Sequence, residues 1–213
     1  VGRAGQYLLH VRLRNQALPL QGSPFTLAVR PGVAHAQSTE LPASESPLRG
    51  VVGLGETAGC HVLLRTSDKM RNVCDRGGAK LEATCSDSQV TASVTDHNDG
   101  TYTIVWRSKY SATSEVYVTI DGVQVLGSPA LMKLTSTQPD LAQTVLAGEG
   151  LANANAGKPA TFRVRFVDEH GNTAIPSDKL QVGLAMLTRT RTRTGTGTCT
   201  CTCTCTCTCT CTC

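Results

Sequence analysis

The sequence predicts an all-β chain of tandem β-sandwich repeats, and three observations support this fold class. Apolar and polar residues alternate with a period of two over many short stretches, as in half-buried strands. Turn signals rich in Gly, Asn and Asp separate these stretches. Several local patterns recur after about 100 residues, the size of a seven-stranded sandwich.

The residues from 90 to 106 predict a β-hairpin in the middle of the chain. Asn98-Asp99-Gly100 is a tight-turn signal, because glycine accepts a positive φ without steric cost and Asn and Asp tolerate it best among the rest. The apolar residues at alternate positions are Val90, Ala92 and Val94 before the turn and Tyr102, Ile104 and Trp106 after it. The alternation places Trp106 in the core and leaves Val105 exposed on the outer face.

Residues 1–30 predict two strands joined by a turn. Tyr7, Leu9, Val11 and Leu13 alternate with more polar neighbours, and a second alternating stretch begins at Phe25. Gly22-Ser23-Pro24 is expected to interrupt the second strand, because glycine permits a bulge and proline removes a ladder donor. Residues 31–50 are rich in Ala, Ser and Pro, which predicts a linker and the start of a new domain.

Alternation resumes after residue 51 and predicts the inward faces of further strands. These faces are Cys60, Val62 and Leu64; Leu81, Ala83 and Cys85; Val116, Val118 and Ile120; and Phe162, Val164 and Phe166. Turns are expected at residues 68–72, 75–78 and 121–122, where Asp, Asn and Gly concentrate.

Internal repetition is the strongest signal of domain organisation. Gly22-Ser23-Pro24 recurs as Gly127-Ser128-Pro129, 105 residues later, and Asp68-x-x-x-Asn72 recurs as Asp168-x-x-x-Asn172. A glycine-containing loop precedes each of the two Asp-Asn segments. A period of this length is typical of sandwich domains in tandem, not of a short solenoid repeat.

Charge and hydropathy exclude several classes of protein. The chain has 20 Lys and Arg against 16 Asp and Glu, and three of the arginines lie in the tail. Basic residues do not interleave with aromatic ones in a stripe, so a nucleic-acid surface is not expected. No apolar run approaches about 18 residues, so no membrane span is expected. The start at Val1, without a leader pattern, predicts a fragment of a longer protein.

Eight of the eleven cysteines belong to a Thr-Cys repeat that runs from Cys199 to Cys213. No zinc or disulfide framework uses this unbroken i, i+2 spacing. We therefore interpret the tail as a translated simple repeat or a gene-model error, with a metal-binding tract as the alternative. The remaining Cys60, Cys74 and Cys85 are odd in number, which fits reduced, buried thiols in a cytosolic protein.

Taken together, the motifs resemble one family, the filamin-type immunoglobulin-like repeat. Its hallmarks are an Asn-x-Asp-Gly-Thr-Tyr hairpin, a Gly-x-Tyr-x-Val-x-Val strand and a closing Gly-Ser-Pro-Phe strand. The matching residues are Asp99-Gly100-Thr101-Tyr102, Gly5-Gln6-Tyr7-Leu8-Leu9-His10-Val11 and Gly22-Ser23-Pro24-Phe25, with Gly127-Ser128-Pro129 in the middle repeat. The middle repeat departs from the pattern at Ser114, Trp106 and Ala130, where the family has tyrosine, tyrosine and phenylalanine.

The resemblance runs over residues 1–185 and implies a domain organisation. Residues 1–31 would be the C-terminal part of one filamin-like repeat, and residues 33–136 a complete repeat. Residues 137–187 would be the N-terminal part of a third repeat. Residues 188–213 form a low-complexity Arg-Thr, Gly-Thr and Cys-Thr tail.

Catalytic and metal-ligating patterns are not expected in this chain. The five histidines are scattered without ligand spacing. Asp96 and Asp99 flank the central turn, and turn formation accounts for Asp99. Asp68 and Asp168 suggest a calcium site as an alternative to loop turns, but the dense carboxylate cluster that calcium needs is missing. The sequence thus predicts a protein that is not an enzyme and has no cofactor and no metal.

The resemblance also implies a docking site, where partners add a strand at the groove between the third and fourth strands. These strands are expected at about residues 79–85 and 89–94. The candidate edge residues are Lys80, Leu81, Glu82, Ala83, Thr84, Cys85, Gln89, Val90, Thr91 and Ala92. Main-chain hydrogen bonds would supply affinity and alternate side-chain pockets specificity. The alternative is an edge blunted by the charges of Lys80 and Glu82.

The functional expectation is a filamin-like scaffold of the actin cytoskeleton in the cytoplasm, with repeats that act as spacers and as docking modules for other proteins. Any actin-binding domain would lie outside these residues. One alternative is a substrate-recruiting module of a ubiquitin ligase, where filamin-like domains also occur. Another is an extracellular adhesion sandwich.

Overall fold

The computed structural model describes residues 2–14, 18–42, 47–153, 155, 158–176, 180–184, 197–200 and 207–211. Within these ranges, regular structure is β, apart from two short 3-10 helices at Ala36–Ser38 and Glu149–Leu151. In the same ranges, no helix has the length and apolarity needed to cross a bilayer.

The chain divides into two compact units. Unit 1 comprises Val1–Gly50, Gly59–Arg107 and Thr113–Lys133, and unit 2 comprises Val51–Ala58, Ser108–Ala112 and Leu134–Cys213.

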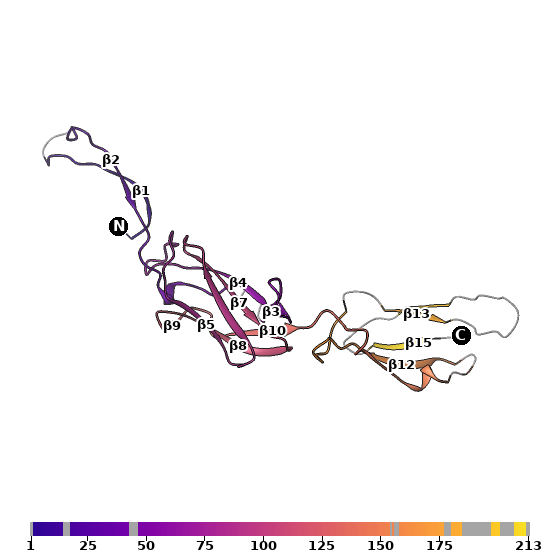
Figure 1. The fold of residues 1–213 in the computed structure, drawn as a ribbon. Helices are drawn as coiled ribbons and strands as arrows, with labels where there is room; N and C mark the ends of the chain where they lie inside the picture. The colour runs from indigo at the N-terminus through magenta and orange to yellow at the C-terminus, as the bar shows by residue number, and fades with distance from the viewer. Residues whose placement is uncertain are drawn as a thin grey trace. The chain divides into compact units, whose positions relative to one another are not determined.

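Strands β3 to β10 form a two-sheet β-sandwich (Figure 1). One sheet has the order β3-β10-β8-β5, with the short β9 beside β8, and the other has the order β4-β7-β6. The strands are β3 (Leu48–Val51), β4 (Cys60–Arg65), β5 (Leu81–Cys85), β6 (Thr91–Asp96), β7 (Thr101–Arg107), β8 (Ala112–Ile120), β9 (Val123–Gln124) and β10 (Ala130–Thr135).

The central hairpin is confirmed. Strands β6 and β7 pair antiparallel, with Asp96 opposite Tyr102, and the turn between them has a φ of 63° at Asn98 and 85° at Gly100. The residues expected to face inward after the turn are 1% (Tyr102) and 0% (Ile104 and Trp106) exposed.

The expectation for Val105 is wrong, because this side chain is buried and not exposed. Its strand β7 is the middle strand of its sheet, so Val105 lies between His61 of β4 and Ser93 of β6. The side chain also packs close to Gly59, where an added Cβ would lie 3.2 Å from the Cγ1 atom of Val105. Burial here depends on strand neighbours that alternation along one strand does not reveal.

The alternating stretches of β4 and β8 also pack inward as expected, whereas Leu81, Ala83 and Cys85 of β5 are only half-buried. The buried apolar side chains of β4, β8 and β10 are Cys60, Val62, Leu64, Val116, Val118, Ile120, Ala130, Met132 and Leu134. Trp106 of the facing sheet is fully buried as well, so the inner faces of the two sheets form one apolar core.

Residues 1–30 form the expected hairpin, in which β1 (Gly5–Leu9) pairs antiparallel with β2 (Phe25–Val29). Gly22-Ser23-Pro24 does not interrupt β2, however, because the strand begins only at Phe25. The second copy of the motif likewise ends just before β10.

The Gly-Ser-Pro motif forms the same turn in both places. Ser23 donates its N–H to the Leu20 carbonyl (3.0 Å), and Ser128 donates to the Val125 carbonyl (3.2 Å). The two hydroxyls each accept a backbone N–H from a neighbouring strand segment, that of Val11 for Ser23 and of Val118 for Ser128, both at 2.9 Å. Proline has no N–H to donate to a neighbouring strand. At this position the serine hydroxyl, instead of a backbone carbonyl, accepts the N–H of the neighbouring segment.

Unit 2 contains β11 (Val145–Ala147), β12 (Ala160–Arg165), β13 (Gln181–Leu184), β14 (Gly197–Thr200) and β15 (Cys207–Cys211). Strands β11, β12 and β15 form one sheet, and β13 pairs with β14. Phe162, Val164, Phe166 and Ala174 form its apolar core, as the alternation of the first three predicts. Of the Thr-Cys tail, only the backbone pairings of β14 and β15 lie within the described residues.

Candidate protein-docking edge

The predicted third and fourth strands correspond to β5 and β6. Each stands last in the strand order of its sheet, and among the described residues β5 pairs only with β8 and β6 only with β7. Within the predicted set, Lys80 precedes β5, Gln89 lies in the turn between the strands and Val90 lies just before β6. The other seven residues lie in the strands themselves.

The backbone of β5 directs alternate residues toward and away from β8. Asp121 donates its N–H to the Lys80 carbonyl (3.0 Å), and Ser86 donates to the Glu115 carbonyl (2.9 Å). In an antiparallel ladder, residues bonded to the partner strand alternate with residues whose N–H and C=O groups point the other way. Ala83 and Cys85 therefore present both their N–H and C=O groups at the open edge. Leu81 presents only its carbonyl there, because its N–H donates to the Ala79 carbonyl at 2.9 Å.

The same alternation separates the side chains of the edge. Leu81, Ala83 and Cys85 are half-buried, whereas Glu82 and Thr84 are exposed. On β6, Ala92 and Val94 are likewise half-buried, and β5 and β6 lie in contact. We call these five half-buried apolar residues the edge strip, and its members are Leu81, Ala83, Cys85, Ala92 and Val94.

The side chains of Lys80 and Glu82 form an ion pair at this edge. Lys80 Nζ lies 3.2 Å from Glu82 Oε1, and both side chains are largely exposed. Such a pair contributes little to stability. It flanks the open backbone groups of β5 without covering the edge strip.

The hairpin-motif residues have structural roles. Asp99 accepts hydrogen bonds from the Thr101 N–H (2.9 Å) and hydroxyl (2.6 Å), which closes the turn. The Gly100 carbonyl accepts from Thr66 N–H and Oγ1, and a Cβ at Gly100 would collide with the Cys74 carbonyl. Tyr102 accepts the Ala79 N–H (2.9 Å), so this buried ring positions the chain that leads into β5.

Asp96 also has a structural role, which the sequence does not reveal. Its carboxylate accepts the N–H groups of Gly78 (2.7 Å) and Asn98 (2.8 Å). The Gly78 bond is the largest cause that lowers the pKa of Asp96. Both carboxylates beside the hairpin turn are thus occupied by local donors, and they do not converge on a common ligand.

The two Asp-Asn segments form closed loops. Asp68 accepts N–H bonds from Met70 and Asn72 on one oxygen and from Gly32 and the Asn72 amide on the other, all between 2.8 and 2.9 Å. Asp168 accepts from the N–H groups of His170 and Asn172 and from the Asn172 amide over the same distances. The donors occupy the oxygens that a calcium ion would need, so the loops are turns.

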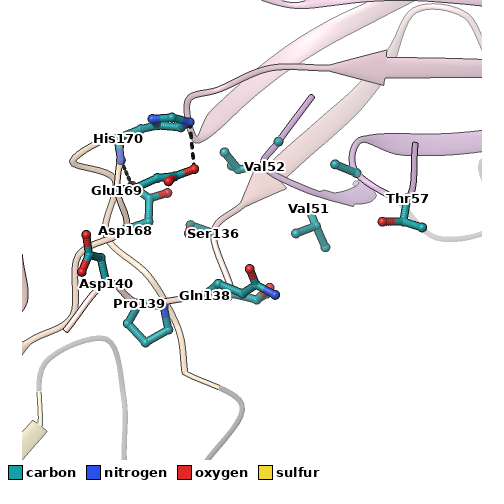
Figure 2. Close-up of a pocket in the computed structure, with 13 residues that line it drawn as sticks. Val51, Val52, Thr57, Ser136, Gln138, Pro139, Asp140, Asp168, Glu169 and His170 are labelled. Carbon is teal, nitrogen blue, oxygen red and sulfur yellow. Dashed lines mark hydrogen bonds and ion pairs between the residues drawn. The ribbon is translucent and has the colours of Figure 1, made fainter. Parts of the chain in front are cut away.

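Unit 2 contains a cavity of about 520 Å³. Figure 2 shows Asp140, Asp168, Glu169 and His170 at its wall. Asp168 is occupied as above, Asp140 accepts the Ala142 N–H (2.8 Å), and Glu169 Oε1 lies 3.5 Å from His170 Nε2. Local bonds account for these groups, so the cavity gives no indication of catalysis.

The three cysteines outside the tail carry free thiols. Cys60 and Cys74 are buried, and Cys85 is half-buried in the edge strip. Burial raises the pKa of the Cys60 thiol to about 11 and raises that of Cys74 as well. Cys60 and Cys74 are thus buried as the sequence predicts, and such neutral thiols behave as small apolar side chains. The prediction is wrong for Cys85, which is only half-buried.

No protein-family model matches this chain, and no curated protein matches it by sequence. Among solved structures, the adhesin FdeC of Escherichia coli aligns with a TM-score of 0.60 at 15% identity, over 97% of this chain and 64% of that one. Invasin, a bacterial integrin-binding protein, aligns with a TM-score of 0.52 at 18% identity, over 87% of this chain and 36% of that one.

The fold is a tandem immunoglobulin-like β-sandwich. The chain spans less than two thirds of the length of either bacterial structure. The Lin-41 filamin domain also aligns, with a TM-score of 0.39 at 11% identity, over 48% of this chain and 97% of that domain. The comparisons support the immunoglobulin-like class, whereas the filamin assignment remains a prediction from the sequence motifs.

Proposed function

We propose that this chain is a non-enzymatic structural array of immunoglobulin-like repeats that docks extended segments of other proteins on strand β5. The observation that carries the proposal is the open edge of β5. There, Ala83 and Cys85 combine outward-pointing N–H and C=O groups with half-buried side chains, and Leu81 adds an outward-pointing carbonyl. A partner strand would gain main-chain hydrogen bonds from the edge and side-chain contacts from the edge strip.

The geometry supports β5 over β6 as the docking strand. Glycines precede β5 at positions 77 and 78, and the buried Tyr102 hydroxyl holds the Ala79 backbone just ahead of the strand. The approach to β5 is therefore fixed from inside the sandwich before a partner arrives. A pre-organised edge loses less conformational entropy on binding.

Selection of peptides against the full chain tests this proposal. Random peptides of about twelve residues, long enough to pair with a typical strand, would be displayed, selected and titrated into isotope-labelled protein. We expect the largest amide shift changes at Ala83 and Cys85, whose N–H groups face the open edge. Selected peptides that shift only residues of β1, β2 or unit 2 would contradict the proposal.

Cell-surface adhesion is a second candidate function. The likeness of the fold to FdeC, an adhesin, and to invasin, an integrin-binding protein, favours it. In this case the array would hold a binding domain away from the cell surface, and the open edge of β5 would have no part in the function. Disulfide formation among Cys60, Cys74 and Cys85 in protein isolated from its source would favour adhesion. Free thiols at all three would favour the cytoplasmic alternative.

The cytoplasmic, filamin-like version of the proposal rests on the sequence motifs. In an actin-associated scaffold, the actin-binding domain would lie outside these residues, so the chain itself should not co-sediment with F-actin. In a ubiquitin ligase, the docked segment would belong to a substrate. The full open reading frame distinguishes the two, since paired helical domains would indicate the first and a Cys/His zinc array the second.

A further inference from the structure

The asparagine of each Asp-Asn loop makes a pair of hydrogen bonds to distant backbone. Asn72 Oδ1 accepts the Ala4 N–H at 2.9 Å, and Asn72 Nδ2 donates to the Gly2 carbonyl at 3.0 Å. The partners lie 68 and 70 residues away in the sequence. One side-chain amide thus binds the carbonyl of one residue and the N–H of the second residue after it.

The second loop repeats this contact with the same geometry. Asn172 Oδ1 accepts the Ser111 N–H at 2.9 Å, and Asn172 Nδ2 donates to the Lys109 carbonyl at 3.0 Å. Each pair of bonds lies inside one compact unit, the first in unit 1 and the second in unit 2.

The two bound segments occupy equivalent places in the chain. Residues 2–4 directly precede β1, and residues 109–111 directly precede β8. Each of these strands is followed by a Gly-Ser-Pro turn whose serine hydroxyl accepts an N–H from the same region, that of Val11 or Val118. The serine contacts do not involve the asparagines, so they are independent support for the equivalence of the two bound segments.

The aspartate of each loop binds a third segment, the one that follows the Gly-Ser-Pro strand. Asp68 Oδ2 accepts the Gly32 N–H at 2.8 Å. The Ser136 hydroxyl bonds to Asp168 in the corresponding position. Gly32 follows β2 and Ser136 follows β10, so each loop binds both the start and the end of an equivalent pair of strands.

We propose that the Asp-x-x-x-Asn loop is a clasp that fastens each repeat to the backbone of the repeat before it. Its partner is an extended main-chain segment, which another copy of the repeat supplies. The bound residues differ in side chain, with Gly2 and Ala4 in one case and Lys109 and Ser111 in the other, while the bonded atoms are the same. The recognition is therefore independent of sequence in the bound segment. This inference does not depend on docking at β5.

Amide hydrogen exchange in the full chain tests the clasp, and the two loops serve as controls for each other. N172A should speed exchange of the Ser111 amide by about tenfold, the factor for one lost hydrogen bond of about 1.4 kcal/mol, and leave the Ala4 amide unchanged. N72A should do the reverse. The Val164 amide in the core of unit 2 should keep its protection in both variants.

Two outcomes would overturn the proposal. The first is that neither variant changes exchange at its target, so that the Ser111 amide in N172A and the Ala4 amide in N72A both exchange at the wild-type rate. If N172A unfolds unit 2, the variant Ser111→Pro tests the clasp instead. This change removes the N–H that Asn172 Oδ1 accepts and leaves the residues of the Asp168 loop unaltered. It should raise exchange at Lys109 and Tyr110 while the Asn172 N–H, which donates to Asp168, stays protected. Unchanged exchange at Lys109 and Tyr110 would be the second contrary outcome.

Discussion

The indole Nε1 of Trp106 donates a hydrogen bond of 3.2 Å to the Thr84 carbonyl. Trp106 lies in β7 and Thr84 in β5, so this bond links the two sheets of the sandwich. The bond holds β5 from the interior of the sandwich, while the edge of β5 that faces away from β8 stays open. A buried tryptophan whose N–H finds a backbone acceptor combines apolar packing with a fixed position.

Trp106→Phe should lower the free energy of unfolding by about 1–3 kcal/mol, since it removes this bond and leaves a small cavity. Urea unfolding followed by far-UV circular dichroism would measure the change. Because Tyr110 is 46% exposed, Tyr110→Phe is a suitable control and should have little effect. Equal stability of wild type and Trp106→Phe would show that the link between the sheets contributes nothing.

Gly100→Ala should destabilise the chain by about 2–4 kcal/mol, because φ is 85° and the new Cβ would collide with the Cys74 carbonyl. Gly122→Ala is the matched control. Its φ is 77°, but an added Cβ there meets nothing within 4 Å, so we expect a loss of only about 1 kcal/mol. Thermal unfolding of the two variants would compare them, and a smaller loss for Gly100→Ala would contradict the packing described above.

The Asp68 loop should make stability depend on pH at low pH. The hydrogen bond from the Asn72 amide, with help from Gly32, lowers the pKa of Asp68 to about 2. A lowered carboxyl pKa contributes stability that is present above the unfolded-state value of about 4 and is lost as the pH falls through the folded-state value.

The stability difference between wild type and Asp68→Asn should therefore shrink as the pH falls from about 4 to 2. Urea unfolding of both proteins at several pH values would follow it. Lys69→Gln, a change at the residue next to Asp68, is the control. Its free energy of unfolding should change with pH in the same way as that of wild type. A difference that stays constant from pH 7 to pH 2 would show that the folded loop does not lower the pKa of Asp68.

The cysteines should react in the order of their exposure. Burial raises the pKa of Cys60 to about 11, so in the folded chain at pH 8 this thiol should resist alkylation. Cys85 is half-buried at the edge of β5 and should be labelled first. Peptide mass spectrometry resolves these sites from the tail cysteines. Faster labelling of Cys60 than of Cys85 would mean that the core around β4 opens more readily than the edge.

Local signals predicted much of the fold. Asn98-Asp99-Gly100 specifies its own turn through glycine φ, and two-residue alternation placed Tyr102 and Trp106 in the core. Val105 could not be placed this way, because its burial comes from His61 and Ser93 on neighbouring strands. Contacts between strands depend on register, which a single stretch of sequence does not contain.

The candidate site was predicted less completely. The family resemblance located β5, but the pattern of open backbone groups at Ala83 depends on its pairing with β8. The Asp68 turn was also predictable from its residues. The bonds from Asn72 to Gly2 and Ala4 were not, because the segments are about 70 residues apart in the sequence.

The central claim is that partners add a strand to β5, and the affinity of a selected peptide for two proline variants tests it most directly. Ala83→Pro removes an N–H that points away from β8, so the sandwich should fold while the open edge loses a donor. Ala92→Pro makes the equivalent change on β6. We predict binding at least about tenfold weaker for Ala83→Pro, the loss of one hydrogen bond or more, and unchanged binding for Ala92→Pro. Wild-type affinity in Ala83→Pro would contradict the account.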